Sequence, residues 1–415
     1  MKILHLSTYD MFGGAARAAY RLHKGLQKIN VDSYMQVQTK IGDDKDIAGP
    51  VNDYIKLLGM IKPTLDRFPL KLYRQRKETH YSLQWLPDPF QPSPVKFNSD
   101  IIHLHWICGG FKRIESLKKI KKPILWTFHD TWAFTGGCHV AGSCERYKNR
   151  CGLCPQLGSK YENDVSRWTW NRKFKAWKNL NLTIVTPSTW LANCVKQSSL
   201  FRNIRVEVIP NGIDTLRFKP IAQNIARDIL NLPQEKYLIL FGAMGATSDK
   251  NKGFQYLQPA LNQLVSQKFE RDIELLIFGA SEPANGPEFN CETKYLGVFH
   301  DDDALALLYS AADVMLVPSI QENLVQTALE SLACGTPVVA FNTTGLIDIV
   351  DHNKNGYLAM PYDPTDFAKG IKTILQADKR TKMEMRKNAV KKANKFFEIE
   401  SVSKKYLSLY KQVLI

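Results

Sequence analysis

Residues 318–340 read PSIQENLVQTALESLACGTPVVA, and this stretch carries the most information about the fold. An apolar run, 313–317, precedes it, and Gly335 and Pro337 separate its middle from a second apolar run, 338–340. This order predicts a strand, a loop, a helix, a tight turn and another strand. Such a βαβ crossover places a ligand-binding loop at the carboxyl end of its first strand.

Two glutamates in this stretch, Glu322 and Glu330, are candidates for binding that ligand. They lie eight residues apart, a little over two helical turns, so both fall roughly on one side of the segment. Two solvated carboxylates on an amphipathic helix are the ordinary explanation of such a pair. We favour a binding role, because the first glutamate falls in the loop after the strand and the second on the helix behind it.

Length and charge limit the classes of protein to consider. The chain has 415 residues and a formal net charge of +16. That length exceeds what one hydrophobic core usually supports, so we expect two domains. The positive charge indicates an anionic partner, which could be nucleic acid, an anionic membrane or a phosphorylated small molecule. We set nucleic acid aside, because the sequence has no helix-turn-helix, zinc-finger array or RNA-binding motif.

The basic residues and the opening of the chain bear on where the protein works. Basic residues cluster at 71–77 (KLYRQRK) and 112–122 (KRIESLKKIKK). No run of eighteen apolar residues is present, and the opening MKILHLSTYD is too short and too polar for a signal peptide. We therefore expect a cytoplasmic protein whose cysteines are reduced.

Short apolar runs alternate with helical segments along the whole chain, which is typical of an α/β fold. Expected strands are 2–6, 100–105, 123–128, 182–186, 206–209, 237–241, 273–279, 294–298, 313–317, 338–340 and the end of 350–360. We expect two Rossmann-like domains facing across a cleft, residues 1–218 and 219–395, and a C-terminal helix, 396–415, that crosses back to the first domain. Residues 41–98 give no clear pattern.

Two features of the first half lie where a Rossmann-like domain binds ligands. Gly13 and Gly14 end the loop after the first strand, but they lack a full G-x-G-x-x-G, so a dinucleotide site is weakly supported. Glycines there would allow the backbone to approach a ligand closely. His129, followed by Asp130, stands at the end of the strand 123–128. A structural role and a catalytic role remain equally supported for this histidine by the residues alone.

Four cysteines, Cys138, Cys144, Cys151 and Cys154, fall within seventeen residues. The final C-x2-C spacing lets two thiolates reach one tetrahedral ion, so structural zinc is our leading hypothesis. Unligated structural cysteines come next, and redox chemistry comes last. Four thiolates leave no open coordination position, so such a zinc ion would hold a loop in place rather than catalyse.

Asp301, Asp302 and Asp303 form a run that could suggest a Mg²⁺ site. They precede an expected helix, where carboxylates cap free N–H groups and suit the helix dipole. We therefore interpret the run as a helix cap.

With these motifs placed, the chain resembles the retaining GT-B glycosyltransferases of family 4. Its E-x7-E motif matches ENLVQTALE at 322–330, and other matches follow the same order along the chain. They are the Gly-Gly loop at 13–14, His129 and Asp130, PST at 187–189, PNGID at 210–214, Lys252 with Gly253, and GTPVV at 335–339. HDTWAFTGGC and CGLCPQ are most similar to enzymes of bacterial exopolysaccharide and O-antigen assembly.

The resemblance implies a nucleotide-sugar donor and assigns roles to residues. The implied catalytic residues are His129 and Glu322, and the implied donor-binding residues are Gly13, Gly14, Lys252, Asn323, Leu324, Val325 and Glu330. Glu330 would bind the ribose hydroxyls, and Glu322 would hold the donor hexose. Lys252 would stabilise the diphosphate as it leaves. No metal cofactor for catalysis is implied.

One position departs from the family pattern. The family normally has an arginine about six residues before the diphosphate lysine, and this chain has Ala246 there. Lys250 has the wrong spacing to replace it. Either another residue compensates, or the phosphate site is weaker than usual.

The resemblance implies transfer of a hexose to a growing saccharide with retention at the anomeric carbon. The acceptor would be a saccharide or a lipid-linked saccharide, and the basic first half would meet an anionic membrane at the inner face of the plasma membrane. Two alternatives are kept. One is a nucleotide-sugar epimerase of the same fold, and the other is a non-catalytic polyanion-binding protein.

Overall fold

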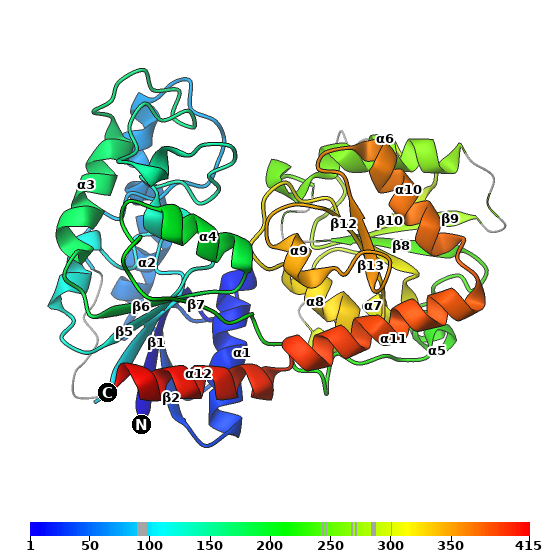
Figure 1. The fold of residues 1–415 in the computed structure, drawn as a ribbon, viewed down its shortest axis with the longest axis horizontal. Helices are drawn as coiled ribbons and strands as arrows, with labels where there is room; N and C mark the ends of the chain where they lie inside the picture. The colour runs from blue at the N-terminus through cyan, green and yellow to red at the C-terminus, as the bar shows by residue number, and fades with distance from the viewer. Residues whose placement is uncertain are drawn as a thin grey trace. The chain divides into compact units, whose positions relative to one another are not determined.

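The computed structural model describes residues 1–88, 98–242, 245, 247–266, 269, 272–283, 288–299 and 301–415. The chain forms two compact units. Unit 1 comprises Met1–Asn211 and Glu400–Ile415, and unit 2 comprises Gly212–Ile399 (Figure 1). The sequence interpretation placed the first boundary after residue 218. Residues 212–218 belong to unit 2 because Ile213 and Phe218 are fully buried in its core, and Ile213 bonds the backbone of Phe397.

Unit 1 is built on a seven-stranded sheet in the order β3-β2-β1-β4-β5-β6-β7, and all its pairs are parallel. The strands are β1 (Lys2–Tyr9), β2 (Asp32–Thr39), β3 (Ile47–Ala48), β4 (Ile101–Leu104), β5 (Ile124–Thr127), β6 (Leu182–Thr186) and β7 (Val206–Val208). The α-helices are α1 (Gly14–Lys28), α2 (Asp53–Asp66), α3 (Val165–Trp177), α4 (Thr189–Gln197) and α12 (Ile399–Val413). Four short 3₁₀ helices join them among the described residues: η1 (Phe68–Leu72), η2 (Ile114–Lys119), η3 (Trp132–Phe134) and η4 (Arg146–Lys148).

Unit 2 repeats the plan with a six-stranded parallel sheet in the order β10-β9-β8-β11-β12-β13. The strands are β8 (Tyr237–Gly242), β9 (Ile273–Phe278), β10 (Glu292–Tyr295), β11 (Val314–Val317), β12 (Val338–Phe341) and β13 (Gly356–Ala359). The helices are α5 (Gln223–Ile229), η5 (Lys250–Lys252), α6 (Phe254–Val265), α7 (Asp302–Ala311), α8 (Gln326–Ala333), α9 (Leu346–Ile349), α10 (Pro364–Leu375) and α11 (Lys379–Phe396). Strands buried on both faces explain the continuous apolar runs in the sequence.

The C-terminal helix α12 packs on unit 1, which confirms the expected return of the chain to its first domain. Val402, Tyr406, Leu409 and Tyr410 join the same buried cluster as Ile3 of β1. Polar contacts fix the register. The Tyr410 hydroxyl lies 2.6 Å from a ring nitrogen of His103, and the Tyr406 hydroxyl lies 3.1 Å from that of Thr127.

Two expectations about helices can be compared with the structure. The Asp301 side chain accepts hydrogen bonds from the backbone N–H groups of Asp303 and Ala304, at 3.2 and 3.0 Å, so the helix-cap interpretation is confirmed. The sequence pattern predicts a helix over residues 253–268, and in the structure α6 ends at Val265, while residues 267 and 268 lie outside the described part. None of the described helices is long and apolar enough to cross a membrane.

Candidate active site

The loop between β11 and α8 lies at the carboxyl end of β11, where the sequence placed it. Glu322 lies in this loop and Glu330 on α8, so the strand, loop and helix prediction is confirmed. Both backbone polar groups of Glu322 form hydrogen bonds. Its N–H donates to Thr344 Oγ1 at 3.1 Å, and its carbonyl accepts from the N–H of Gly345 at 2.9 Å.

The Glu322 carboxylate forms an ion pair with Lys252, whose Nζ lies 2.6 Å from Oε1. Both side chains keep some exposure, 17% for Glu322 and 22% for Lys252. Burial would lower the pKa of Lys252, but the charge and the hydrogen bond of Glu322 outweigh it and raise that pKa above its usual value. The loop therefore presents a fixed cation beside a fixed carboxylate.

Two residues bring Lys252 to the loop. Gly253 adopts a φ of +77°, and a Cβ atom built on it would lie 1.8 Å from the carbonyl oxygen of Pro318. Only glycine allows this close approach. Asn251 joins the segments through its side chain, which donates to the Gln321 carbonyl at 2.7 Å and accepts from the Gln321 N–H at 3.2 Å.

Glu330 lies deeper than Glu322, with only 2% of its surface exposed. The hydroxyl of Tyr309, on α7, donates to its Oε2 at 2.9 Å. The two glutamates therefore have different surroundings, one at a charged loop and the other against a buried helix.

The N-terminus of α8 follows the loop directly, and no side chain caps it. Val325 is the capping residue, while Asn323 and Leu324 before it are 8% and 7% exposed. The backbone N–H groups at the start of a helix favour anions. The position of the missing arginine, Ala246, lies outside the described residues, and Lys250 is exposed at the start of η5.

In unit 1, Gly13 and Gly14 lie between β1 and α1. Gly13 has a φ of +92°, and a Cβ atom there would meet nothing within 4 Å, so the backbone faces open space. The buried carboxylate of Asp10 anchors this loop. It accepts from the N–H groups of Met11, Ile41 and Gly42 at 2.8–3.0 Å.

His129 follows β5, and its Nε2 lies 3.3 Å from Nδ1 of His105. Burial lowers the pKa of His129 to about 4, although the neighbouring Asp130 charge acts in the opposite direction. The imidazole is therefore neutral near pH 7. A neutral ring can hold a hydroxyl by a hydrogen bond but supplies no positive charge.

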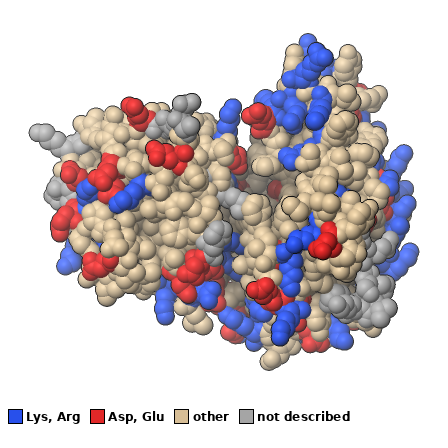
Figure 2. Space-filling model, turned by 180° about the vertical axis from the view of Figure 1, so that it is seen from behind, with Lys and Arg blue, Asp and Glu red and all other residues tan. Residues whose placement is uncertain are grey.

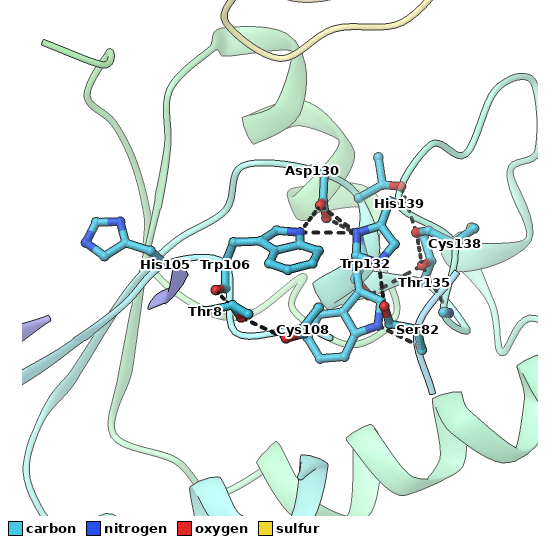
Figure 3. Close-up of polar contacts among 12 residues, drawn as sticks. Thr8, Ser82, His105, Trp106, Cys108, Asp130, Trp132, Thr135, Cys138 and His139 are labelled. Carbon is cyan, nitrogen blue, oxygen red and sulfur yellow. Dashed lines mark hydrogen bonds and ion pairs between the residues drawn. The ribbon is translucent and has the colours of Figure 1, made fainter. Parts of the chain in front are cut away.

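The neighbouring Asp130 carboxylate serves a different network, shown in Figure 3. It accepts from His139 Nδ1 at 2.7 Å, from Trp106 Nε1 at 2.8 Å and from the N–H of Trp132 at 2.8 Å. Burial alone would raise the pKa of Asp130, but His139 and the hydrogen bonds keep it below its usual value. Asp130 thus fixes the cysteine-bearing loop, through His139, against the end of β5.

The four predicted zinc ligands line one small cavity of about 20 Å³, together with Tyr81. All four are free thiols, and burial raises the pKa of Cys138, of Cys151 (to about 12) and of Cys154. The turn that carries the last two is tightly constrained. Cys151, Gly152 and Leu153 have φ values of 54°, 87° and 47°, and Arg167 donates two hydrogen bonds to the Cys151 carbonyl.

A second group of potential metal ligands lies in the core of unit 1. Within the described residues, His5, His103 and His105 are the one set of three or more whose donor atoms all lie within 4.8 Å of one another, and the cysteine sulfurs are more widely spaced. Both ring nitrogens of His103 already have partners, the Tyr410 hydroxyl and Thr127 Oγ1. We therefore interpret the three histidines as a buried hydrogen-bond network.

Two family models match the chain in succession. The model described as Glycosyltransferase Family 4 matches residues 12–217, and the model described as Glycosyl transferases group 1 matches residues 235–377. The chain belongs to glycosyltransferase family 4. The first match covers most of unit 1 and ends six residues beyond its junction with unit 2, and the second match lies within unit 2.

Similar proteins agree with membership of family 4. A D-inositol 3-phosphate glycosyltransferase of Corynebacterium jeikeium is 34% identical over 193 residues, which is 43% of this chain and 45% of that protein. The chain spans about half the length of the curated relatives it matches.

Two solved structures show that the fold is GT-B. Sucrose-phosphate synthase from Thermosynechococcus elongatus matches with a TM-score of 0.69 and 19% identity, covering 100% of this chain and 99% of that one. HepE from Anabaena, solved in complex with UDP and glucose, matches with a TM-score of 0.63 and 16% identity, covering 99% of each chain. At these identities the likeness establishes the fold alone.

Three positioning residues of this family 4 chain were missed by the sequence analysis. Asn251, with Gly253, holds Lys252 against the β11–α8 loop, Asp10 anchors the Gly13 loop, and His139 bonds Asp130. Their partners lie 9 to 70 residues away in the sequence. All three stand close to motifs already identified, but nothing local in the sequence marks these partners.

Proposed function

We propose that the protein is a retaining hexosyltransferase that moves a hexose from a nucleoside-diphosphate sugar to a growing saccharide in cell-surface polysaccharide synthesis. The observation that carries this proposal is the Lys252–Glu322 pair at the carboxyl end of β11. Beside the uncapped start of α8, this pair offers charge for a diphosphate and a carboxylate for sugar hydroxyls. Family 4 membership and the complexes of HepE with UDP-glucose support a nucleotide-sugar donor.

The reaction needs charge stabilisation more than a protein nucleophile. The bond between the anomeric carbon and the diphosphate oxygen breaks, and the acceptor oxygen bonds to that carbon on the same face. The proton of the acceptor hydroxyl passes to the departing phosphate oxygen. Lys252 and the N–H groups at Asn323, Leu324 and Val325 offset the negative charge that grows on the leaving group.

The carboxylates have positioning tasks in this scheme. Glu322 is bound to Lys252, which suits it to hold the hexose hydroxyls rather than to attack the anomeric carbon. Glu330 binds the ribose hydroxyls. His129 holds the donor sugar through its neutral ring, and the backbone at Gly13 and Gly14 approaches the phosphate.

The proposed acceptor is a saccharide or a lipid-linked saccharide, and the proposed place of work is the cytoplasmic face of the plasma membrane. The net charge of +16 supports an anionic surface as a partner. Nucleic acid is not among the proposed partners.

We also propose structural zinc at Cys138, Cys144, Cys151 and Cys154. The shared cavity and the constrained turn at Cys151–Leu153 support it. The four sulfur atoms are more widely spaced than the ligands of one ion, so the cysteine side chains would have to turn toward the cavity to bind zinc. Lys173 supports it too, because its amine is buried near Cys138 and Cys151. Burial lowers the pKa of Lys173 to about 7, and four neighbouring thiolates would favour its protonated form, which offsets part of their negative charge. Metal analysis of protein purified without chelators should find about one equivalent, and less than about half an equivalent of zinc or iron would contradict it.

The experiment that tests the enzymatic proposal is incubation with a panel of UDP, GDP and ADP sugars, with and without saccharide acceptors. Release of a nucleoside diphosphate that depends on the acceptor supports transfer. An isomerised nucleotide sugar without release would support the epimerase instead. No turnover and no binding of any donor would favour a polyanion-binding protein.

A further inference from the structure

The helix α2 and the 3₁₀ helix η1 that follows it have an unusual distribution of side chains. Eight large apolar residues between positions 51 and 72 are exposed: Val51, Tyr54, Leu57, Met60, Ile61, Leu65, Phe68 and Leu72. Their exposed fractions run from 43% to 84%. Six of them recur at spacings of three and four residues, which places them along one side of a helical path. These six are Tyr54, Leu57, Ile61, Leu65, Phe68 and Leu72. We call these eight residues the apolar stripe.

The buried side of α2 is polar, the reverse of an ordinary surface helix. Lys62 is 6% exposed and donates to the carbonyl of Pro87, while Asp66 is 1% exposed. The Asp66 carboxylate accepts from the backbone N–H groups of Leu83 and Trp85, at 2.9 and 3.3 Å. Gln38 of β2 donates to the Gly59 carbonyl at 3.2 Å. These contacts fix which side of the helix faces outward.

The stripe is also held firmly at its end. Leu70 of η1 is fully buried in one cluster with Tyr81, Leu83 and Leu157. Phe68 and Leu72, on either side of Leu70, therefore point outward on a fixed base. An apolar row of this length on an anchored element marks an interaction surface, because single exposed apolar residues are scattered on ordinary surfaces.

Charge around the stripe identifies the partner. The exposed basic residues between positions 51 and 80 are Lys56, Arg67, Lys71, Arg74, Arg76 and Lys77. The exposed acidic residues of the same segment are Asp53 and Glu78. Figure 2 shows Lys and Arg gathered at the upper end of unit 1. Apolar side chains flanked by Lys and Arg match a bilayer surface, where the apolar part enters below anionic headgroups.

We propose that α2 and η1 dock unit 1 on an anionic phospholipid bilayer, with the apolar stripe inserted among the lipids and the six basic residues on the headgroups. The inference rests on the proposed function, since a lipid-linked acceptor would be presented at such a surface. It goes beyond that function by naming the element that binds and the side chains that enter the membrane.

The test is flotation of the full chain with vesicles of phosphatidylglycerol and phosphatidylcholine, compared with vesicles of phosphatidylcholine alone. A stripe variant carries Leu57→Gln, Ile61→Gln and Leu65→Gln. A charge variant carries Lys71→Gln, Arg74→Gln and Lys77→Gln. The matched control carries Leu216→Gln, Ile225→Gln and Ile229→Gln, which remove from unit 2 three apolar residues that are at least as exposed as most of those changed in the stripe variant. Circular dichroism and thermal unfolding verify that each variant is folded.

The wild type should bind the anionic vesicles at low salt, and the stripe variant should bind at least about tenfold more weakly. The charge variant should lose the preference for anionic over neutral lipid, and the control should bind as the wild type does. Three results would overturn the proposal. They are no binding by the wild type, equal binding by the stripe variant, and a wild-type dimer that the stripe variant converts to monomer without any change in vesicle binding.

Nucleoside diphosphate release in vesicle-free solution separates this inference from the proposed function. The stripe variant should turn over a water-soluble acceptor at the wild-type rate. If the wild type binds vesicles as expected but turns over no donor, the enzymatic proposal fails while the docking surface stands. If donor turnover is normal and vesicle binding is absent, the docking surface fails while the enzymatic proposal stands.

Discussion

Glu330 illustrates how two carboxylates of one motif come to lie in different surroundings. Its position on α8 and its contact with Tyr309 place it against the core, away from the charged loop that holds Glu322. A carboxylate in such surroundings binds a pair of neighbouring hydroxyls strongly, because it faces little competition from water.

Glu330→Ala should weaken binding of the donor nucleotide by about 1–3 kcal/mol, since a buried charged hydrogen bond is lost. Isothermal titration calorimetry measures the change. Glu235→Ala, at an exposed position of unit 2, is the matched control and should bind as the wild type does. Tyr309→Phe removes the internal hydroxyl but keeps the carboxylate, so it should retain most of the affinity. Unchanged affinity in Glu330→Ala would remove this residue from the ribose role.

His129→Ala should lower turnover by more than it lowers nucleotide affinity, because the ring is proposed to hold the sugar. The pKa of about 4 means that His129 is neutral throughout pH 6–8, so protonation of this residue should cause no change in rate across that range. Initial rates and nucleotide affinities of the wild type and the variant provide the comparison. A variant that turns over as fast as the wild type would return His129 to a structural role.

The sequence identified these residues because their motifs are local. Glu322 and Glu330 share one βαβ unit, and His129 ends a strand that its own apolar residues reveal. Asn251 and His139 were not identified, because their roles depend on partners such as Gln321 and Asp130 that only folding brings close.

The connection between η5 and α6 shows how an element positions a charged side chain. Gly253 lets this connection approach Pro318 so closely that any side chain would collide with the carbonyl oxygen. The position of Lys252 therefore depends on a neighbouring residue that has no side chain.

Gly253→Ala should destabilise unit 2 and weaken donor binding, because the connection must move away from Pro318. Gly297→Ala is the control. Gly297 has a similar φ of +69° but open space around it, so alanine there costs about 1 kcal/mol of backbone strain without a collision. Urea unfolding should show a larger loss of stability for Gly253→Ala than for Gly297→Ala, and calorimetry should show a larger loss of donor affinity. Equal losses in the two variants would contradict the positioning role.

Elements were predictable where the buried side chains are apolar. Strand β6 has the bounds that the sequence indicated, since an apolar run followed by Pro187 delimits it. Helix α2 was missed although its apolar residues recur at helical spacings, because residues 41–98 were interpreted as irregular. Strand β2 was missed because two of its buried residues, Gln36 and Gln38, are polar.

At the scale of the whole molecule, the histidines of unit 1 link stability to pH. Burial lowers the pKa of each of five histidines below its usual value, and the five are His5, His23, His103, His105 and His129. His5, His103 and His105 also repel one another's positive forms, and the nearby carboxylates Asp44, Asp46 and Asp130 offset only part of the effect at His23 and His129.

Stability should therefore fall as the pH is lowered from 7 to 5. The unfolded chain binds protons at these histidines near pH 6.5 while the folded chain does not, so each contributes a loss of up to about 1.4 kcal/mol per pH unit below that value. Urea unfolding at pH 7, 6 and 5 measures the slope. His23→Gln should reduce this slope by the contribution of one histidine. A free energy of unfolding that stays constant or rises toward pH 5 would contradict this account.

At this scale the two α/β units were predictable, because the alternation of strands and helices runs the length of the chain. The return of α12 to unit 1 was also expected, although no pattern in the sequence requires it. The boundary at Asn211 and Gly212 was displaced from the expected position, since the backbone bonds of Ile213 to residues 397 and 399 leave no mark on the sequence.

The central claim is that Lys252, paired with Glu322, binds the diphosphate of the donor. Calorimetric affinity for the nucleoside diphosphate of the preferred donor tests it most directly, with Lys252→Met compared with Lys250→Met two residues away. We predict that Lys252→Met weakens binding at least about tenfold, the loss of one charged hydrogen bond, while Lys250→Met binds as the wild type does. Equal affinities of the wild type and Lys252→Met would contradict the account.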